Sequence, residues 1–202
     1  MTDPSVLTII LNFRTPELTL KALDAALREM AGIRGEILVV DNGSGDDSCE
    51  VLTRGIEGLA NPPVPVRFKA SARNGGFGAG NNFGMHAGLS DGTQPDFYYI
   101  LNSDAFPQKG AIRNLIAHMQ THRHCGIAGS AIRGVDGEPH QTAFRFPTIA
   151  GEFEGAGVAE LEVGFEDIEP AAGLGVLAAA FARDQPAVPE RARFETELGA
   201  RE

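Results

Sequence analysis

The sequence predicts an α/β protein with a mostly parallel sheet that is covered by helices on both faces. Short β-prone apolar runs alternate with amphipathic segments through the first two-thirds of the chain. The apolar runs are continuous rather than alternating, which is typical of parallel strands buried on both faces. Polar residues follow the ends of several runs, where open parallel sheets hold their ligands.

The first strand is expected at residues 6–11, with a helix directly after it. Thr15 can cap this helix, Pro16 suits its first position, and Glu17 suits the positive end of its dipole. Leucines and a methionine at helical spacing give the segment one apolar face as far as residue 30. Two glycines then end the helix.

The next elements repeat the pattern. A second buried strand is expected at residues 36–41, and Asp46 or Asp47 can cap a short helix after it. A proline-rich link leads to a third strand near residues 66–69. The glycine-rich stretch 74–82 then runs into a helix that extends to about residue 88.

A fourth strand is expected at residues 97–101, followed by a helix whose apolar residues include Ile112 and Met119. Residues 127–132 suit a further strand. The composition changes after residue 148, where lysine disappears and Ala, Gly and Glu dominate. We therefore divide the chain into a domain at 1–150 and an atypical acidic segment at 151–202, in which residues 174–181 could form a helix.

The net charge of −10 argues against nucleic acid or an anionic membrane surface as the main partner. Residues 152–202 hold 12 acidic and 4 basic residues, whereas residues 1–151 are nearly neutral. The cysteines Cys49 and Cys125 form no CxxC pair, which fits reduced thiols. No signal peptide is recognisable, so we expect a cytoplasmic protein and leave open a peripheral association with the inner membrane face.

Three polar groups at strand ends could carry chemistry. Asp104 could bind a hard divalent ion with support from Asn102, or it could cap the following helix. Asp41 could accept a hydrogen bond from a nucleobase, or it could cap the next turn. The stretch 74–82 offers backbone N–H groups that a phosphate can approach, although it matches neither a Walker loop nor GxGxxG.

Other chemistries have weaker support. His118, His122 and His124 lie on or just after one helix, but no carboxylate is placed among them, so a solvated helix end is favoured. There is no GxSxG motif, and Ser103 has no obvious histidine partner, which argues against a hydrolase triad.

Four segments in order resemble the family 2 glycosyltransferases of the GT-A fold, in particular the bacterial rhamnosyltransferase-like branch. They are LTIILNFRTPE (7–17), ILVVDNGSGD (37–46), NGGFGAGNN (74–82) and LNSD (101–104), with RFPT (145–148) also similar. The resemblance covers about residues 5–150. Asn102 stands where the family's DxD motif usually has its first carboxylate, which leaves Asp104 as one direct carboxylate.

The resemblance implies a site for a UDP- or dTDP-linked sugar in the domain at 1–150. It assigns Mg²⁺ or Mn²⁺ on the diphosphate to Asp104. It assigns the nucleoside and the rest of the nucleotide-sugar site to Ile10, Asn12, Asp41, Asn74, Gly76, Asn81 and Asn102. The implied reaction is inverting transfer to the hydroxyl of a glycan or lipid-linked acceptor, as in cell-surface polysaccharide biosynthesis.

The family also uses a carboxylate as general base on the acceptor. Residues 165–169 (FEDIE) are the one similar segment, so Asp167 is the candidate base; an acidic surface segment is the other interpretation. One alternative function is a shortened GT-A domain that binds nucleotide sugar with little or no transfer. Another is a sugar nucleotidyltransferase, which lacks support because no glycine- and lysine-rich signature follows the first strand. A second copy of the chain, forming a homodimer, could cover apolar surface that a short acceptor region leaves exposed.

Overall fold

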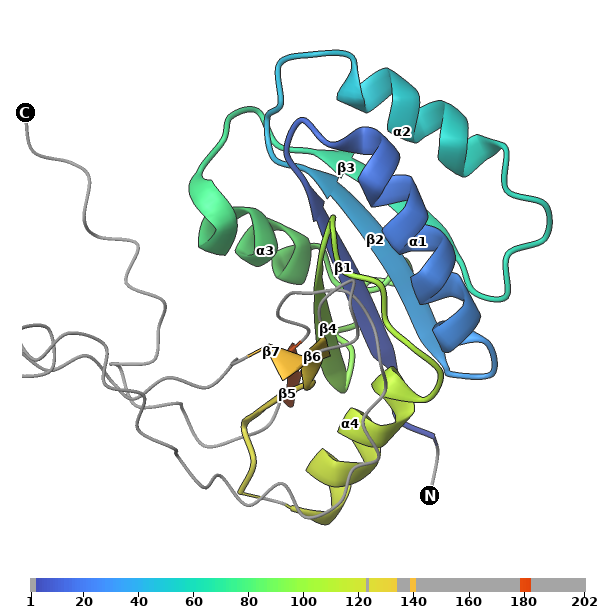
Figure 1. Cartoon of the computed structure of the whole chain (residues 1–202), viewed down its shortest axis with the longest axis vertical. Coiled ribbons are helices and arrows are strands. Elements are labelled where there is room, and N and C mark those ends of the chain that lie inside the picture. The colour runs from blue at the N-terminus through green and yellow to red at the C-terminus, as the bar shows by residue number, and fades with distance from the viewer. Residues whose placement is uncertain (1–2, 123, 134–138, 141–178, 183–202) are drawn as a thin grey trace, which may run out of the picture.

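The computed structural model describes residues 3–122, 124–133, 139–140 and 179–182 (Figure 1). Strands and helices alternate along the chain as far as α4, after which short strands follow. In chain order the elements are β1 (Val6–Asn12), α1 (Pro16–Met30), β2 (Gly35–Asp41), α2 (Ser48–Glu57), β3 (Val66–Ala70), α3 (Gly76–Ala87), β4 (Phe97–Asn102), α4 (Ala111–Thr121), β5 (Ile127–Gly129), β6 (Ile132–Arg133), β7 (Pro139–His140) and β8 (Ala179–Ala182).

The main sheet has the strand order β3-β2-β1-β4-β8-β5. The first four strands are parallel, and β8 is antiparallel to both of its neighbours, β4 and β5. In the register of β1 and β2, Asn12 pairs with Asp41, while Leu11 pairs with Asn102 of β4. The carboxyl ends of the three central strands therefore meet at one edge, which we call the carboxyl rim.

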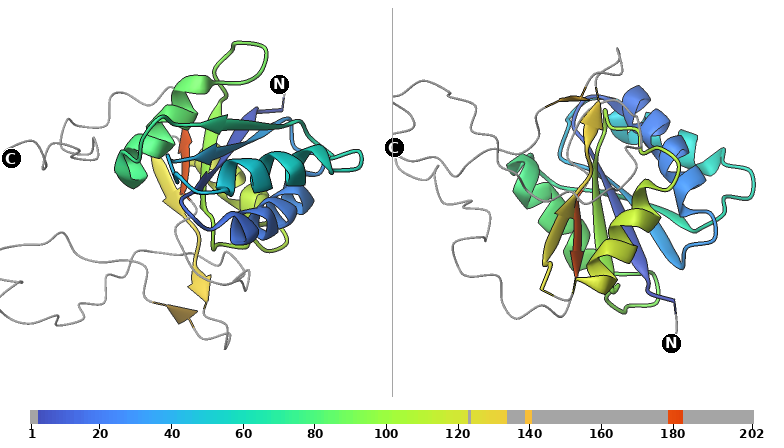
Figure 2. Two further views of the ribbon diagram at one scale, coloured as in Figure 1. Left: turned by 90° about the horizontal axis from the view of Figure 1, so that it is seen from above. Right: turned by 60° about the horizontal axis from the view of Figure 1, so that its bottom comes forward.

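Helices cover both faces of the parallel strands, as Figure 2 shows from above. On one face, α1, α2 and α4 pack over the larger core, which includes Ile10, Val39 and Leu101. On the other face, α3 packs over a smaller core built around Ile9 and Val40. Alternate residues of the same strands thus enter opposite cores, which is why these strands read as continuous apolar runs.

Glycine lets α3 lie very close to the sheet. A Cβ added at Gly80 would come within 2.6 Å of Leu11 Cδ1, and one at Gly84 within 2.9 Å of Ile9 Cγ2. These two glycines are four residues apart and so lie on the same side of the helix. Most of the glycine-rich stretch 74–82 is therefore helical, and part of its glycine content serves packing rather than a loop.

The predicted α/β sheet with helices on both faces is confirmed. The expected strand within 127–132 is two short strands, β5 and β6, which belong to different sheets. The prediction of a helix at 174–181 is wrong where it can be compared, because residues 179–182 form β8. Hydrogen bonding to β4 and β5 on either side overrides the helical preference of an alanine-rich segment.

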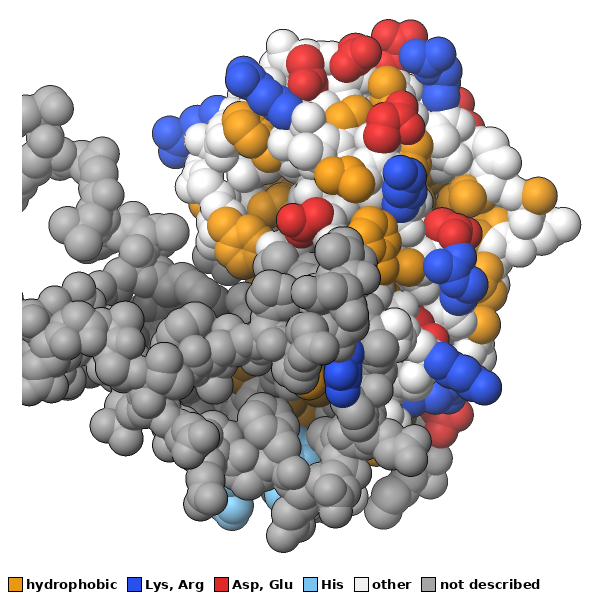
Figure 3. All heavy atoms as spheres, in the orientation of Figure 1, with side chains coloured by type: hydrophobic (Ala, Val, Ile, Leu, Met, Phe, Trp, Pro, Cys, Tyr) orange, Lys and Arg blue, Asp and Glu red, His pale blue; other side chains and the backbone are white. Residues whose placement is uncertain are grey.

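In the part of the chain that the structure describes, no helix is long and apolar enough to cross a lipid bilayer. On the face drawn in Figure 3, acidic and basic side chains are interspersed over α1 and α2. This mixture agrees with the nearly neutral balance of the first 151 residues.

Candidate functional site

A buried carboxylate organises the carboxyl rim at the end of β2. Asp41 is 1% exposed, and its Oδ1 accepts hydrogen bonds from Asn12 Nδ2 at 2.7 Å and from Ser44 Oγ at 2.5 Å. Its Oδ2 accepts a third from Ser44 N at 3.0 Å. Burial alone raises the pKa of Asp41, but the hydrogen bonds from Ser44 and Asn12 outweigh it and hold this pKa below its ordinary value.

Cys49 lies beside this carboxylate. Burial raises the pKa of the Cys49 thiol, and the negative charge of Asp41 raises it further. The thiol therefore stays protonated near neutral pH.

Both the nitrogen and the oxygen of the Asn12 side-chain amide form hydrogen bonds within the protein. Besides donating to Asp41, Asn12 accepts hydrogen bonds through Oδ1 from Thr19 Oγ1 at 2.8 Å and from Thr15 N at 3.3 Å. Asn12 and Ile10 are both fully buried. The side chains of Ile10, Asn12 and Asp41 are thus buried at or near the carboxyl ends of β1 and β2.

The segment before α3 is tied to the end of β2. Asn42 Nδ2 donates to Asn74 Oδ1 at 3.0 Å and to Gly76 O at 3.1 Å, and Gly76 N donates to Asn74 Oδ1 at 2.8 Å. Gly43, at φ +67°, lies so close to the backbone of Arg73 that an added Cβ would come within 2.4 Å of it. Asn74 and Gly76 are exposed and lie on the rim surface.

Asn81 lies one turn into α3 and is buried. Its Nδ2 donates to Phe77 O at 2.9 Å. Among the described residues, its Oδ1 and the Oδ1 of Asn42 have no hydrogen-bond partner.

The segment after β4 forms a turn, closed by a hydrogen bond from Ala105 N to Asn102 O at 3.2 Å. Asp104 is exposed at this turn, which we call the 102–105 turn. The Oδ1 of Asn102 is buried and has no partner within the described residues. Ser103 Oγ accepts a hydrogen bond from Thr15 Oγ1 at 3.0 Å, which connects the turn to the start of α1.

The donor set suits a divalent ion that is shared with a ligand. In the described part of the chain, no group of three or more His, Cys, Asp or Glu side chains is placed to hold a metal. Mg²⁺ commonly binds through one or two carboxylates together with waters and substrate phosphates. The exposed carboxylate of Asp104, two residues along the chain from Asn102, fits that mode and does not fit a closed all-protein cage.

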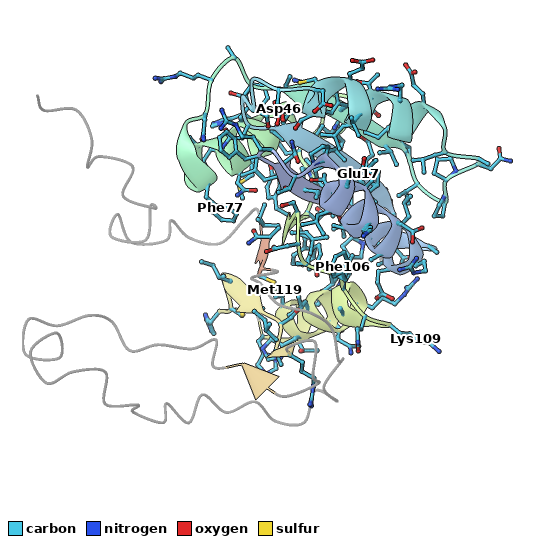
Figure 4. The ribbon with its side chains drawn as sticks, turned by 45° about the horizontal axis from the view of Figure 1, so that its top comes forward. Glu17, Asp46, Phe77, Phe106, Lys109 and Met119 are labelled. Atoms are coloured by element: carbon cyan, nitrogen blue, oxygen red, sulfur yellow. The ribbon has the colours of Figure 1, made fainter. Side chains whose placement is uncertain are left out.

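Exposed aromatic rings border the rim, which the sequence patterns did not indicate. Phe13 and Phe77 are 40% and 39% exposed. The guanidinium of Arg14 lies 5.1 Å from the centre of the Phe13 ring, and Arg14 Nε donates to Ser44 O at 3.0 Å. Figure 4 shows Phe77 at the start of α3 and Asp46 in the loop after β2.

Thr15, Asn42, Ser44 and Ser103 join the rim segments, although none was predicted as a site residue. Polar residues within three positions of a strand end were the available signal, and this signal did not show which residue each side chain would contact. Asp167 lies outside the described residues.

A separate cleft lies at the other end of the molecule. It is lined by residues just before β1 and β2 and by α4, including Arg34, Arg113 and Ile116. Residues that precede parallel strands lie at their amino ends, so this cleft is remote from the carboxyl rim.

Fold and site together define a parallel α/β domain that presents a polar rim at the carboxyl ends of its strands. Residues 5–165 match the family described as Glycosyl transferase family 2, and the chain belongs to this family. The family predicted from the sequence is thereby confirmed. No curated protein sequence matches the chain significantly.

Solved structures of low identity share the fold. One is the mannosyltransferase PcManGT from Pyrobaculum calidifontis in complex with GDP-Man and Mn²⁺, with 18% identity and a TM-score of 0.56; the match covers 66% of this chain and 37% of that one. Another is S. aureus TarS 1–349 in complex with UDP-GlcNAc, with 15% identity and a TM-score of 0.52, covering 68% and 37%. This chain therefore spans less than two-fifths of the length of these structures.

Proposed function

We propose that this chain is the donor-binding part of a metal-assisted, inverting glycosyltransferase. It would take a hexosyl or rhamnosyl group from a UDP- or dTDP-linked donor and transfer it to the hydroxyl of a glycan or lipid-linked acceptor. The carboxyl rim carries the proposal, because three strand-end segments are hydrogen-bonded together there beside the exposed carboxylate of Asp104. Membership of the family supports it.

In the proposed complex the donor lies across the rim. The nucleoside rests over the turn that Asp41 and Ser44 hold in shape, with the Phe13 ring beside it. Asn74 and Gly76 line the adjoining surface, and Asn81 supports them from the first turns of α3. Asn12 and Ile10 contribute by fixing the end of β1.

Asp104 would hold Mg²⁺ or Mn²⁺, with the Asn102 amide in support. When bound, the ion offsets negative charge on the departing nucleoside diphosphate. The complex of the Pyrobaculum mannosyltransferase with GDP-Man and Mn²⁺ supports a divalent ion in this fold. The role of the chain itself is to present one carboxylate at the tip of a turn, toward solvent and the incoming diphosphate.

The acceptor side of the proposal rests on Asp167 as general base. A carboxylate there would remove the proton from the acceptor hydroxyl as it attacks the anomeric carbon. We further propose a role in cell-surface polysaccharide synthesis in the cytoplasm, at or near the inner face of the membrane. If Asp167→Asn leaves the turnover of a transferring preparation unchanged, the assignment of the base is wrong.

The metal assignment is tested by calorimetric titration with UDP and with dTDP, each with and without Mn²⁺. We expect one of these nucleotides to bind more tightly with Mn²⁺, and Asp104→Ala to abolish that gain. Asp47→Ala is the matched control, because Asp47 is an exposed aspartate on the neighbouring loop and makes no helix-capping hydrogen bond. A gain that survives in Asp104→Ala would refute the metal assignment.

A further inference from the structure

The 102–105 turn is held at two points. Its far end is fixed because Ala105 is 3% exposed and its N–H donates to Asn102 O. Its tip, Ser103 and Asp104, projects beyond the core. Among the described residues, the hydrogen bond from Thr15 Oγ1 to Ser103 Oγ is the single side-chain hydrogen bond that reaches this turn.

Thr15 is itself held in place by its backbone. It occupies the N-cap position of α1, yet its side chain makes no capping hydrogen bond, which leaves the hydroxyl for Ser103. Its N–H donates to Asn12 Oδ1, and its carbonyl accepts hydrogen bonds from the N–H and the hydroxyl of Thr19, each at 3.0 Å. The hydroxyl is therefore presented to the turn from a fixed position.

Hydrogen bonds connect residues across the whole rim. They run from the buried Asp41 carboxylate to the Asn12 amide, from that amide to Thr15, and from Thr15 to Ser103, which precedes Asp104. This series of hydrogen bonds connects the turn after β2 with the turn after β4.

We propose that Thr15 is a positioning residue that holds the Asp104 carboxylate ready for a divalent ion and couples it to the nucleoside side of the rim. This inference rests on the proposed function and assigns a determinant of metal affinity within it. Without the Thr15 hydroxyl the tip of the turn loses its side-chain restraint, and binding the ion must then also pay for ordering the carboxylate.

The test compares Thr15→Val with the unmodified protein in titrations of UDP and dTDP, with and without Mn²⁺. Valine keeps the shape of threonine and removes the hydroxyl. We expect the affinity gain from Mn²⁺ to fall about fivefold, as for loss of one hydrogen bond, while metal-free affinity changes less than about twofold. Thr15→Ser, which keeps the hydroxyl, should restore the gain.

Ser103→Ala removes the other partner of the same bond without altering α1, so it carries the test even if Thr15→Val fails to fold. If the two residues act through their shared bond, the double variant should lose less than the product of the two single losses. Independent, multiplicative losses would overturn the inference, as would an unchanged Mn²⁺ gain in both single variants. If the unmodified protein itself shows no Mn²⁺-dependent binding of either nucleotide, the proposed function fails first and the inference falls with it.

Discussion

At the scale of single residues, Asp41 shows how a charge can be kept beneath the carboxyl rim. A carboxylate that is 1% exposed would ordinarily take up a proton, since burial favours the neutral form. Ser44 and Asn12 supply hydrogen bonds that favour the ionised form instead. The charge thus helps to fix the turn after β2.

We predict a pH-dependent stability difference between the protein and Asp41→Asn. The folded-state pKa of Asp41 lies below its ordinary value of 3.8, so its stabilising effect is present above that pH and is lost as the pH falls through the folded-state pKa. Chemical denaturation at pH 7 should show a loss of about 1–3 kcal/mol in Asp41→Asn, because its amide cannot accept all of the same hydrogen bonds.

The loss should shrink as the pH is lowered below 3.8, the ordinary pKa. Asp47→Asn, at an exposed position, should differ little from the unmodified protein at any pH. A difference for Asp41→Asn that is constant from neutral to strongly acid pH would contradict the ionised, hydrogen-bonded carboxylate.

The sequence predicted the position of this residue at a strand end, but not its role. Continuous apolar runs locate the ends of β1 and β2, which places Asn12 and Asp41 side by side at the rim. Whether the Asn12 amide faces a ligand or the neighbouring carboxylate also depends on the turn at Ser44. The pattern of apolar and polar residues does not specify the contacts of that turn.

At the scale of elements, α3 shows glycine used for close packing. Gly80 and Gly84 bring the helix against β1 and β2, which a run of glycines alone did not distinguish from a phosphate-binding loop. Because α3 begins at Gly76, only the first two residues of the stretch 74–82 lie outside the helix. The strand β8 could not be predicted either, since its conformation comes from distant pairing partners.

Gly84→Ala should therefore destabilise the protein, although alanine favours helices. The added Cβ would lie 2.9 Å from Ile9 Cγ2, inside a buried core that has little room to move. We expect a net loss of about 1–2 kcal/mol, with overpacking outweighing the gain in helix propensity. Thermal melting of Gly84→Ala and the unmodified protein measures this loss of stability.

Asn82→Ala is the matched control, because it places alanine at an exposed position of the same helix. It should leave the melting temperature nearly unchanged or slightly raised. Equal melting temperatures for Gly84→Ala and Asn82→Ala would show that α3 does not pack as described.

At the scale of the whole molecule, hydrogen bonds between side chains and turns join the strand ends into one rim. Asn42 connects β2 to the segment before α3, and Thr15 connects the start of α1 to the 102–105 turn. The family and the parallel fold were predictable because they depend on the order of strands, helices and motifs. The two bonds just named were not predictable, because they join residues 32 and 88 positions apart.

Asn42→Ala tests whether this union matters for ligand binding. It removes the donors to Asn74 Oδ1 and Gly76 O, so the loop before α3 loses its attachment to β2. We expect about 1–3 kcal/mol less stability and weaker nucleotide binding with Mn²⁺ present, measured by denaturation and titration. Asn114→Ala, at an exposed position on α4, is the control and should change neither stability nor binding. Unchanged nucleotide binding in Asn42→Ala would show that the loop before α3 does not contribute to the binding site.

The central claim is that nucleotide and metal bind together at the carboxyl rim. The most direct measurement is a crystal structure grown with Mn²⁺ and whichever of UDP or dTDP binds, in which anomalous scattering locates the metal. The account predicts a Mn²⁺ ion within bonding distance of the Asp104 carboxylate, with the nucleotide lying over the turn at Asp41 and Ser44. A nucleotide in the cleft at Arg34 and Arg113, or Mn²⁺ bound away from Asp104, would contradict it.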